Sequence, residues 1–453
     1  MVDWQSLTQL ITVLNDFVWS WLLVVLLLGT HLFLTLKIGF IQRYLFTGIR
    51  LSVTPEKNRQ SKGEISPFGA LATALGGTVG TGNIAGVATA LSTGGPGAIF
   101  WMWMSGVLGI ATRYAETVLS VKYRQVDSAG ARIGGPMFVL QKGLGAKWLA
   151  GAFAVFTILS ALGSGNAVQS NSIAVLAFDS YSVSTNTTGL LLAALTGIVI
   201  FRGIRGIAVA SEYLVPIMTV VYILACLYLL YILRQNVGLA ILQILKSAFS
   251  SDSAVGGLAG IGVKEALRYG SARGLFSNEA GQGSAPIAAA AARTPNSVRQ
   301  GLIQASTVFW DTIIICALTG IVLVSAGDWQ KPHDGVILTV KAFDLIPVIG
   351  APLLTFSLFL FVFTTILGWC YYGEIATEYL WGRKFVVWYR LAWVITVWVG
   401  STLTLEMAWV VSDLTTGLMA FPSLIAVLLL WREVKSETQR FIHRLDDVDE
   451  TLD

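Results

Sequence analysis

The stretch Ala72-Thr-Ala-Leu-Gly-Gly-Thr-Val-Gly-Thr-Gly-Asn-Ile-Ala-Gly86 determines how the rest of the chain is interpreted. It is apolar enough to enter a bilayer, yet it holds five glycines, with Thr78, Thr81 and Asn83 among them. Each glycine destabilises a helix by about 1 kcal/mol relative to alanine, so the pattern predicts a membrane helix that unwinds midway. Close helix packing through small residues is the alternative. The polar residues favour the broken helix, which in transporters marks the binding site.

Composition places the chain in a membrane. Of its 453 residues, 55% are hydrophobic and 12% are charged, whereas soluble domains carry about 25% charged residues. Three cysteines and three histidines are scattered without metal-ligand spacing or a catalytic triad. We therefore expect a polytopic membrane protein that is not an enzyme and has no resident cofactor. The net charge of +4 comes from basic loops and does not indicate a nucleic-acid partner.

Eleven apolar segments predict eleven membrane spans. The N-terminus lacks the basic region of a signal peptide, so the first span is retained. The loops assigned to the cytoplasm, with 113–147 among them, hold 23 Lys and Arg residues, against four in the outer loops. This bias predicts a cell-membrane protein with its N-terminus outside and its C-terminus inside. The spans are about 17–36, 67–91, 98–112, 148–178, 188–201, 207–233, 254–292, 301–325, 352–376, 388–402 and 406–431.

A second glycine-rich break, Gly274-Leu-Phe-Ser-Asn-Glu-Ala-Gly-Gln-Gly-Ser-Ala-Pro286, lies in the seventh span. Spans 2–6 and 7–11 are thus two five-helix blocks that each open with a broken helix and run in opposite directions. This inverted repeat favours a transporter that works by alternating access. The predicted single transporter domain comprises an extra first helix with a basic loop, the two repeats and a cytoplasmic tail: 1–66, 67–233, 252–431 and 432–453.

Three motifs resemble the alanine/glycine:cation (sodium:alanine) symporter family of the amino acid–polyamine–organocation superfamily. They are Gly94-Gly-Pro-Gly-Ala-Ile-Phe-Trp-Met-Trp103, Gly80-Thr-Gly-Asn-Ile-Ala-Gly86 and Phe276-Ser-Asn-Glu-Ala-Gly281. The resemblance covers essentially the whole chain. It implies an all-α fold similar to that of the bacterial leucine transporter, preceded by one extra helix. It also implies uptake of alanine, glycine or both, with Na⁺ as the coupling ion.

A zwitterionic amino acid needs hydrogen-bond donors for its carboxylate and acceptors for its ammonium group. Broken helices supply both, because their free backbone groups face the break. By position, and by resemblance to the leucine transporter's motif, the N–H groups of Thr81 and Gly82 are expected to bind the carboxylate. The carbonyls of Phe276 and Ser277, with Asn278 nearby, are expected to accept hydrogen bonds from the ammonium.

Three further residues, together with the Phe276 ring, are expected at the substrate. Gln169 on the fourth span can bond either end of the amino acid, or it can hydrogen-bond between helices; the family resemblance favours the ligand role. Phe276 and Trp369 are candidates for closing the pocket over a small side chain, although aromatic residues in membrane helices also serve packing. Thr78, at the first break, completes the predicted set.

A sodium site is predicted where spans 2 and 9 meet, as in the site shared across the superfamily. Two adjacent hydroxyls and two carbonyls would form its cage: those of Thr364, Thr365, Gly76 and Val79. Alternatively, both hydroxyls bond to their own helix. A second sodium site that uses Asn83 and the Thr78 carbonyl is a further hypothesis.

Acidic residues inside the spans favour a competing hypothesis, because such residues are functional candidates by default. They are Glu116, Glu279, Asp311, Glu374 and Asp413. A proton-coupled carrier would use one of them, whereas a structural Glu279 would bond to backbone N–H groups of the unwound loop. The remaining alternatives are an exchanger, a channel, which would lack paired breaks, and a transporter-like sensor, which would need a signalling domain.

Overall fold

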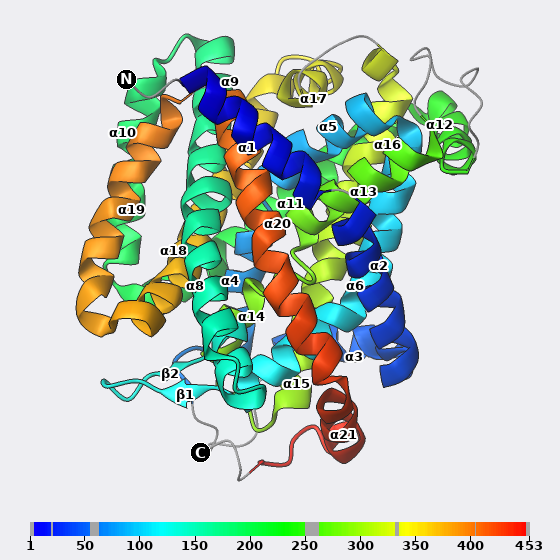
Figure 1. Ribbon diagram of the computed structural model, residues 1–453. Helices are drawn as coiled ribbons and strands as arrows, with labels where there is room; N and C mark the ends of the chain where they lie inside the picture. Colours follow the sequence, from blue (N-terminus) through cyan, green and yellow to red (C-terminus); the bar gives the residue numbers. More distant parts are fainter. Residues whose placement is uncertain are drawn as a thin grey trace.

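The computed structural model describes residues 4–19, 21–54, 63–249, 262–330, 335–403 and 405–449. Almost all of these residues form helices packed into one bundle (Figure 1). A two-stranded antiparallel hairpin, β1 (Gln125–Val126) and β2 (Arg132–Ile133), lies at one end of the bundle. We call this end the α21 end after α21 (Trp431–Phe441), and the opposite end the α1 end after α1 (Trp4–Val18).

The structure is that of a multi-pass membrane protein. Six helical stretches in the described ranges are long and apolar enough to cross a bilayer: Gln9–Ile38, Lys147–Tyr181, Gly203–Ile232, Ser297–Ala326, Gly350–Trp381 and Trp409–Leu429. The prediction of eleven spans counts shorter and broken helices in addition. That number stays a prediction.

The helices follow one another in the order that the repeat predicts. The first block comprises α4 (Pro67–Thr78), α5 (Ala85–Gly94), α6 (Pro96–Lys122), α8 (Lys147–Leu162), α9 (Val168–Tyr181), α10 (Thr185–Ile200) and α11 (Gly203–Ile232). The second block comprises α13 (Val263–Asn278), α14 (Ala285–Ala290), α15 (Ser297–Val308), α16 (Ala317–Ala326), α18 (Gly350–Trp381), α19 (Val386–Ser401) and α20 (Leu405–Leu429). Each block opens with a broken helix, α4–α5 or α13–α14.

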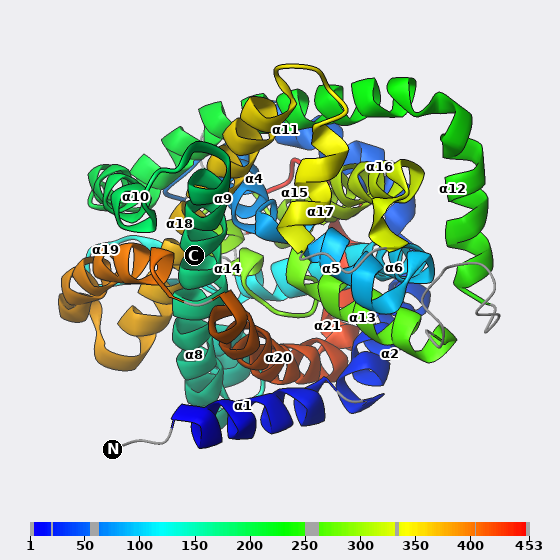
Figure 2. The same ribbon diagram turned by 90° about the horizontal axis from the view of Figure 1, so that it is seen from above.

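The remaining elements connect or flank these blocks. They include α2 (Trp21–Ile38), α3 (Leu45–Val53), α7 (Pro136–Phe138), the surface helix α12 (Arg234–Ser247) and α17 (Gly335–Phe343), the last inside the predicted outer loop 327–345. Two π-helical segments, Gly163–Ala167 and Phe309–Cys316, join α8 to α9 and α15 to α16. Seen from above, the broken helices lie in the middle of the bundle, and α8, α10, α11, α12 and α19 lie around them (Figure 2).

The glycines of the opening stretch serve two purposes. Gly77 lies inside α4, which continues to Thr78, and packs against α18 so closely that a Cβ on Gly368 would come within 2.9 Å of the Gly77 Cα. Gly80 and Gly82 lie in the break itself. Close packing and unwinding, which the sequence presented as alternatives, therefore both occur, at different glycines.

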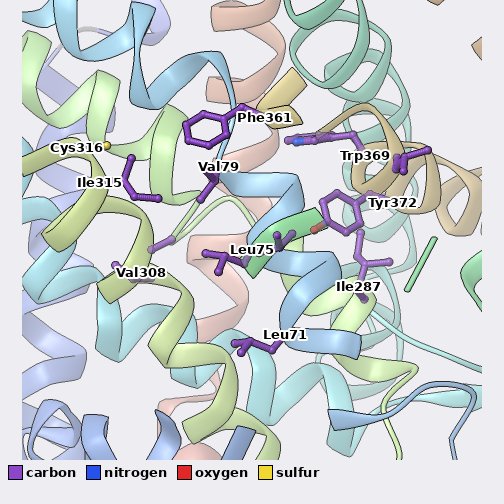
Figure 3. Close-up of a cluster of buried hydrophobic side chains, with 14 of the residues drawn as sticks. Leu71, Leu75, Val79, Ile287, Val308, Ile315, Cys316, Phe361, Trp369 and Tyr372 are labelled. Atoms are coloured by element: carbon purple, nitrogen blue, oxygen red, sulfur yellow. The ribbon is translucent and has the colours of Figure 1, made fainter. Parts of the chain in front are cut away.

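Apolar side chains pack around the first break (Figure 3). Leu71, Leu75 and Val79 of the α4 segment lie between α18 and the α15–α16 stretch. The labelled side chains of α18 are Phe361, Trp369 and Tyr372, and those of the α15–α16 stretch are Val308, Ile315 and Cys316. All of these residues are buried, so the unwound backbone is enclosed by protein. Such enclosure is what unwound backbone at membrane depth requires.

One assignment from the sequence is wrong. The segment that begins at Arg113 was expected to be a cytoplasmic loop, but α6 continues to Lys122. Arg113 is therefore an interior residue of a helix, and its side chain is fully buried. A charge at such a position is tolerated because buried carboxylates and a carbonyl surround it, and sequence hydropathy does not register those partners.

Candidate substrate and sodium site

The first break places free backbone groups next to Gln169 of α9. A 3₁₀ turn, Thr81–Asn83, separates α4 from α5. The Thr81 N–H donates to Gln169 Oε1 at 3.1 Å, and the Gly80 N–H donates to Asn83 Oδ1 at 2.9 Å. The Gln169 amide oxygen thus occupies the acceptor position that was predicted for a substrate carboxylate. The Thr81 hydroxyl is buried, and among the described residues it has no hydrogen-bond partner.

The second break begins where α13 ends at Asn278. Glu279 follows in the left-handed conformation, with φ 54°, which stops the helix. The Asn278 carbonyl accepts a hydrogen bond from the buried Arg113 guanidinium, while Arg113 Nε and Nη1 have no partner among the described residues. Arg113 also interacts electrostatically with three buried carboxylates, those of Glu116, Glu279 and Asp311.

Two carbonyls at this break are left without their usual helical donors. The Ala280 N–H donates to Asn278 Oδ1 at 2.9 Å, and in this described segment the Gly281 N–H makes no backbone bond to the Ser277 carbonyl. In a continuous helix these N–H groups would bond to the carbonyls of Phe276 and Ser277, four residues earlier. Both carbonyls are therefore available as acceptors, which agrees with their predicted contact to an ammonium group.

Asp311 joins the two breaks. Its Oδ1 accepts from Asn83 Nδ2 at 2.7 Å, and its Oδ2 accepts from Ser277 Oγ and from Thr312 Oγ1, both at 2.7 Å. The carboxylate is fully buried in the π-helical segment Phe309–Cys316. The sequence marked Asp311 only as a candidate for proton coupling. Its place between the breaks could not be inferred, because its partners are 34 and 228 residues away.

Three of the four predicted sodium ligands lie together. Thr365 Oγ1 lies 3.0 Å from the Gly76 carbonyl oxygen and 3.2 Å from that of Val79. The Thr364 hydroxyl instead bonds to the carbonyls of Leu360 and Phe361 on its own helix, at 3.0 and 3.2 Å. This geometry is the alternative that the sequence left open for both threonines. The Thr78 hydroxyl likewise bonds to its own helix, at the Leu75 carbonyl.

Gly80 is a site residue that the sequence analysis did not single out. A Cβ on Gly80 would lie 2.6 Å from Thr365 Oγ1 and 3.0 Å from Gln169 Oε1. The candidate sodium ligands and the candidate substrate ligands are therefore separated by this one residue. The signals for it in the sequence were its place in the glycine-rich stretch and in the motif Gly80–Gly86.

Aromatic rings cover the substrate side of the breaks. The Phe276 ring lies 5.0 Å from that of Trp409 on α20, and a Cβ on Gly82 would lie 3.0 Å from Phe276 Cδ1. Arg273 lies over both rings, at 5.6 and 5.1 Å, and forms an ion pair with Asp413, with Nη1 3.0 Å from Oδ1. Residues of α13 and α20 thus close the site toward the α1 end.

The Trp369 side chain connects α18 to the second break through a hydrogen bond. Its indole N–H donates to Glu279 Oε1 at 2.9 Å, and its ring packs against Gly165, where no Cβ would fit. Glu279 also accepts from the Ser284 hydroxyl. In the described structure the side chain of Glu279 thus bonds to two side chains, whereas the sequence had assigned it bonds to backbone N–H groups of the unwound loop.

Comparisons with known proteins identify the family. The model of the sodium:alanine symporter family matches residues 4–451. The chain is 46% identical to the sodium/alanine symporter AgcS of Methanococcus maripaludis, over 96% of this chain and 97% of that protein. It is 36% identical to the probable sodium/glutamine symporter GlnT of Bacillus subtilis, over 95% and 90%.

The fold also has a solved counterpart. The crystal structure of MhsT in complex with L-phenylalanine matches with a TM-score of 0.58 at 14% identity, over 85% of this chain and 98% of that one. At this identity the match shows the fold alone. The family and these relatives are transporters rather than enzymes. The chain belongs to the sodium:alanine symporter family.

Proposed function

We propose that this protein takes up a small neutral amino acid, alanine, glycine or both, across the cell membrane together with sodium. The observation that carries the proposal is the position of Gly80 in the first break, between the Gln169 amide on the substrate side and Thr365 Oγ1 on the sodium side. The second broken helix contacts this break at Gly82 and Asn83. The sodium/alanine symporter AgcS, at 46% identity, supports the same function. Since relatives at 36–38% identity include a probable glutamine symporter, the exact substrate is part of the proposal.

In the proposed binding mode, the substrate carboxylate takes the place of Gln169 Oε1 at the Thr81 N–H and also meets Gly82. The ammonium group bonds to the carbonyls of Phe276 and Ser277, which lack helical donors. Gln169, once displaced, can bond to the substrate through its amide. The close contact between Gly82 and the Phe276 ring leaves space for only a small side chain.

Sodium is proposed to bind between Thr365 Oγ1 and the carbonyls of Gly76 and Val79, while the predicted fourth ligand, Thr364, stays bonded to its own helix beside them. A second sodium would use Asn83 and the Thr78 carbonyl, and the Asp311 carboxylate beside Asn83 would favour a cation there. One sodium that crosses a potential of about 100 mV releases about 2.3 kcal/mol. A tenfold sodium gradient adds about 1.4 kcal/mol, enough to concentrate the substrate without ATP.

Alternating access requires that the site open to one side at a time. We infer that the α21 end is cytoplasmic, because the basic loops lie there, and that the α1 end is outside. Phe276, Trp409 and the Arg273–Asp413 pair would then form the outer closure. The two breaks would move relative to α9 and α18 as this closure opens and the inner side closes.

A proton-coupled carrier is the second candidate, and Asp311 and Glu279 favour it. Both carboxylates are buried at the second break, and both touch groups of the proposed site. An intramembrane carboxylate can carry the coupling proton in such proteins. The two candidates differ in which gradient drives uptake, so one experiment separates them.

Uptake of labelled alanine and glycine into proteoliposomes tests the proposal. An inward sodium gradient is compared with equal potassium on both sides plus an inward proton gradient. Accumulation that needs sodium supports the symporter. Accumulation driven by protons alone rejects it and transfers the coupling role to Asp311 or Glu279. If labelled alanine binds but neither gradient drives accumulation, an exchanger or a sensor replaces the symporter.

A further inference from the structure

Helix α1 lies outside the two repeats and crosses the α1 end instead of running through the bundle. In Figure 1 it passes in front of α20, and in Figure 2 it extends along the edge of the bundle beside α20. It packs against α20 and is followed directly by α2, which does enter the bundle. The sequence predicted a single first span, about 17–36, and gave no separate role to this segment.

The described side chains of α1 divide into three faces. Ile11, Asn15 and Val18 are partly or fully buried and form the packed face. Leu10, Val13, Leu14 and Phe17 form a second face that is apolar and exposed, at 55%, 59%, 44% and 70%. Their spacing of three and four residues places them on one side of a helix. Gln9, Thr12 and Asp16 form a third face, which is polar and exposed.

Neither water nor lipid alone accounts for two exposed faces of opposite polarity. In water, four large apolar side chains in one row would remain unburied, at a cost of about 25 cal/mol per Å². In the hydrocarbon core, the exposed polar groups of Gln9 and Asp16 would be transferred out of water at a cost in free energy. At the boundary between the two phases, each face meets the medium that suits it.

We propose that α1 lies in the membrane–water interface at the α1 end, with Leu10, Val13, Leu14 and Phe17 inserted between lipid headgroups. Directly after α1 in the chain, Leu22 and Val25 of the apolar helix α2 are each 61% exposed as well. Because α2 belongs to a stretch that is long and apolar enough to cross a bilayer, its exposed apolar side chains face lipid, and we infer that the adjoining face of α1 meets lipid rather than a second copy of the chain.

The position of α1 links the lipid surface to the outer closure. The Trp19 indole N–H, one residue beyond α1, donates to the Asp413 backbone carbonyl at 3.0 Å. Asp413 is the partner of Arg273, and Asp16 on the polar face pairs with Arg268 of α13 at 2.9 Å. Anchored in the interface, α1 would hold both helices of the closure, α13 and α20, at a fixed depth in the membrane.

Depth-dependent fluorescence quenching tests the proposal. The three native cysteines are buried. Single cysteines at Phe17→Cys and Gln9→Cys are labelled in the full chain with a polarity-sensitive dye and reconstituted in phosphatidylcholine vesicles. Spin-labelled phosphatidylcholine is the quencher in the lipid, and iodide is the quencher in water. The Phe17 label is expected about 5–10 Å into the headgroup–acyl boundary and protected from iodide, whereas the Gln9 label is quenched by iodide.

The other outcomes overturn the proposal. If iodide quenches both labels equally, α1 lies in water. If lipid quenches both labels equally, α1 lies within the hydrocarbon. If neither quencher reaches the Phe17 label, protein covers the apolar face, and a cross-link between two labelled copies would identify a second chain. Val13→Cys repeats the measurement on the apolar face if the Phe17 variant does not fold. None of these results depends on which substrate or ion is transported.

Discussion

At the scale of single residues, Thr364 and Thr365 offer a matched pair. Thr365 reaches across to the Gly76 and Val79 carbonyls, whereas Thr364 bonds to its own helix. Thr365→Ala is therefore expected to raise the sodium concentration for half-maximal uptake about tenfold or more, since a polar contact to a charged group contributes about 1.5–3 kcal/mol. Thr365→Ser keeps the hydroxyl, so its sodium concentration for half-maximal uptake should stay close to that of the wild type.

Thr364→Ala serves as the control in the same uptake assay. The Thr364 hydroxyl bonds to the carbonyls of Leu360 and Phe361 and contacts the Met218 sulfur. Because none of these groups belongs to the proposed cage, the sodium concentration for half-maximal uptake should change little. Equal effects of the two alanine variants would show that both threonines contribute to the cage, and a larger effect of Thr364→Ala would show that the cage is assigned to the wrong threonine.

Arg113 is expected to matter through its charge. The guanidinium is fully buried and holds the Asn278 carbonyl beside three buried carboxylates. Arg113→Gln leaves those carboxylates without a cation, and breaking such a buried set costs about 3–5 kcal/mol. We expect a clear fall in the melting temperature of the purified protein. Arg113→Lys should lose less, and equal melting of wild type and Arg113→Gln would contradict this role.

The sequence predicts the local part of the site better than its distant part. Thr81, Gly76 and Val79 could be proposed from the sequence because glycines and polar residues concentrate within one short stretch. The role of Asp311 and the burial of Arg113 were not found, because each is defined by partners on other helices. Hydropathy assigns a charged residue in a membrane protein to a loop when its buried partners are not known. Arg113 was therefore placed in a loop.

At the scale of the helical elements, the break in α4–α5 provides another matched pair. Gly80 lies between Thr365 and Gln169, at 2.6 and 3.0 Å from its added Cβ, whereas the nearest atom to a Cβ on Gly86 is 3.9 Å away. Gly80 has φ −143°, which alanine adopts without strain, so the effect of Gly80→Ala is steric. We expect Gly80→Ala to raise both the alanine concentration and the sodium concentration that give half-maximal uptake.

Gly86→Ala is the control for this prediction. Gly86 lies inside α5, and alanine there should stabilise the helix by up to about 1 kcal/mol. Uptake by Gly86→Ala should therefore stay near the wild-type level, with an equal or higher melting temperature. Loss of uptake in both variants would mean that the whole stretch, and not Gly80 alone, is intolerant of side chains.

Periodicity and hydropathy predict helical elements well where each helix is long and continuous. The fourth span, predicted at about 148–178, appears as α8 and α9, and the ninth, at about 352–376, appears as α18. The separation of α1 from α2 was not predicted, since apolar residues continue through both. The end of α6 was misplaced because the cationic Arg113 and Lys122 resembled the start of a basic loop.

At the scale of the whole molecule, one ion pair toward the α1 end, Arg273–Asp413, joins the first and last helices of the second block, α13 and α20. Both side chains are largely buried, with 11% and 13% exposed. Removal of either charge leaves the other without its partner at a cost of about 3–5 kcal/mol, so Asp413→Asn and Arg273→Gln should each impair closure. We expect slower alanine uptake with little change in sodium half-saturation, because the Thr365 cage lies on α4 and α18.

A double-mutant cycle shows whether the pair acts as a unit. If it does, the double variant Arg273→Gln/Asp413→Asn loses less activity than the two single losses combined. Arg205–Glu64, at 2.7 Å near the α21 end, is the comparison, because Arg205 is 75% exposed there. Exposed pairs contribute at most about 1 kcal/mol, so Glu64→Gln should leave uptake nearly unchanged. Additive losses at Arg273 and Asp413 would show that this contact does not hold α13 and α20 together.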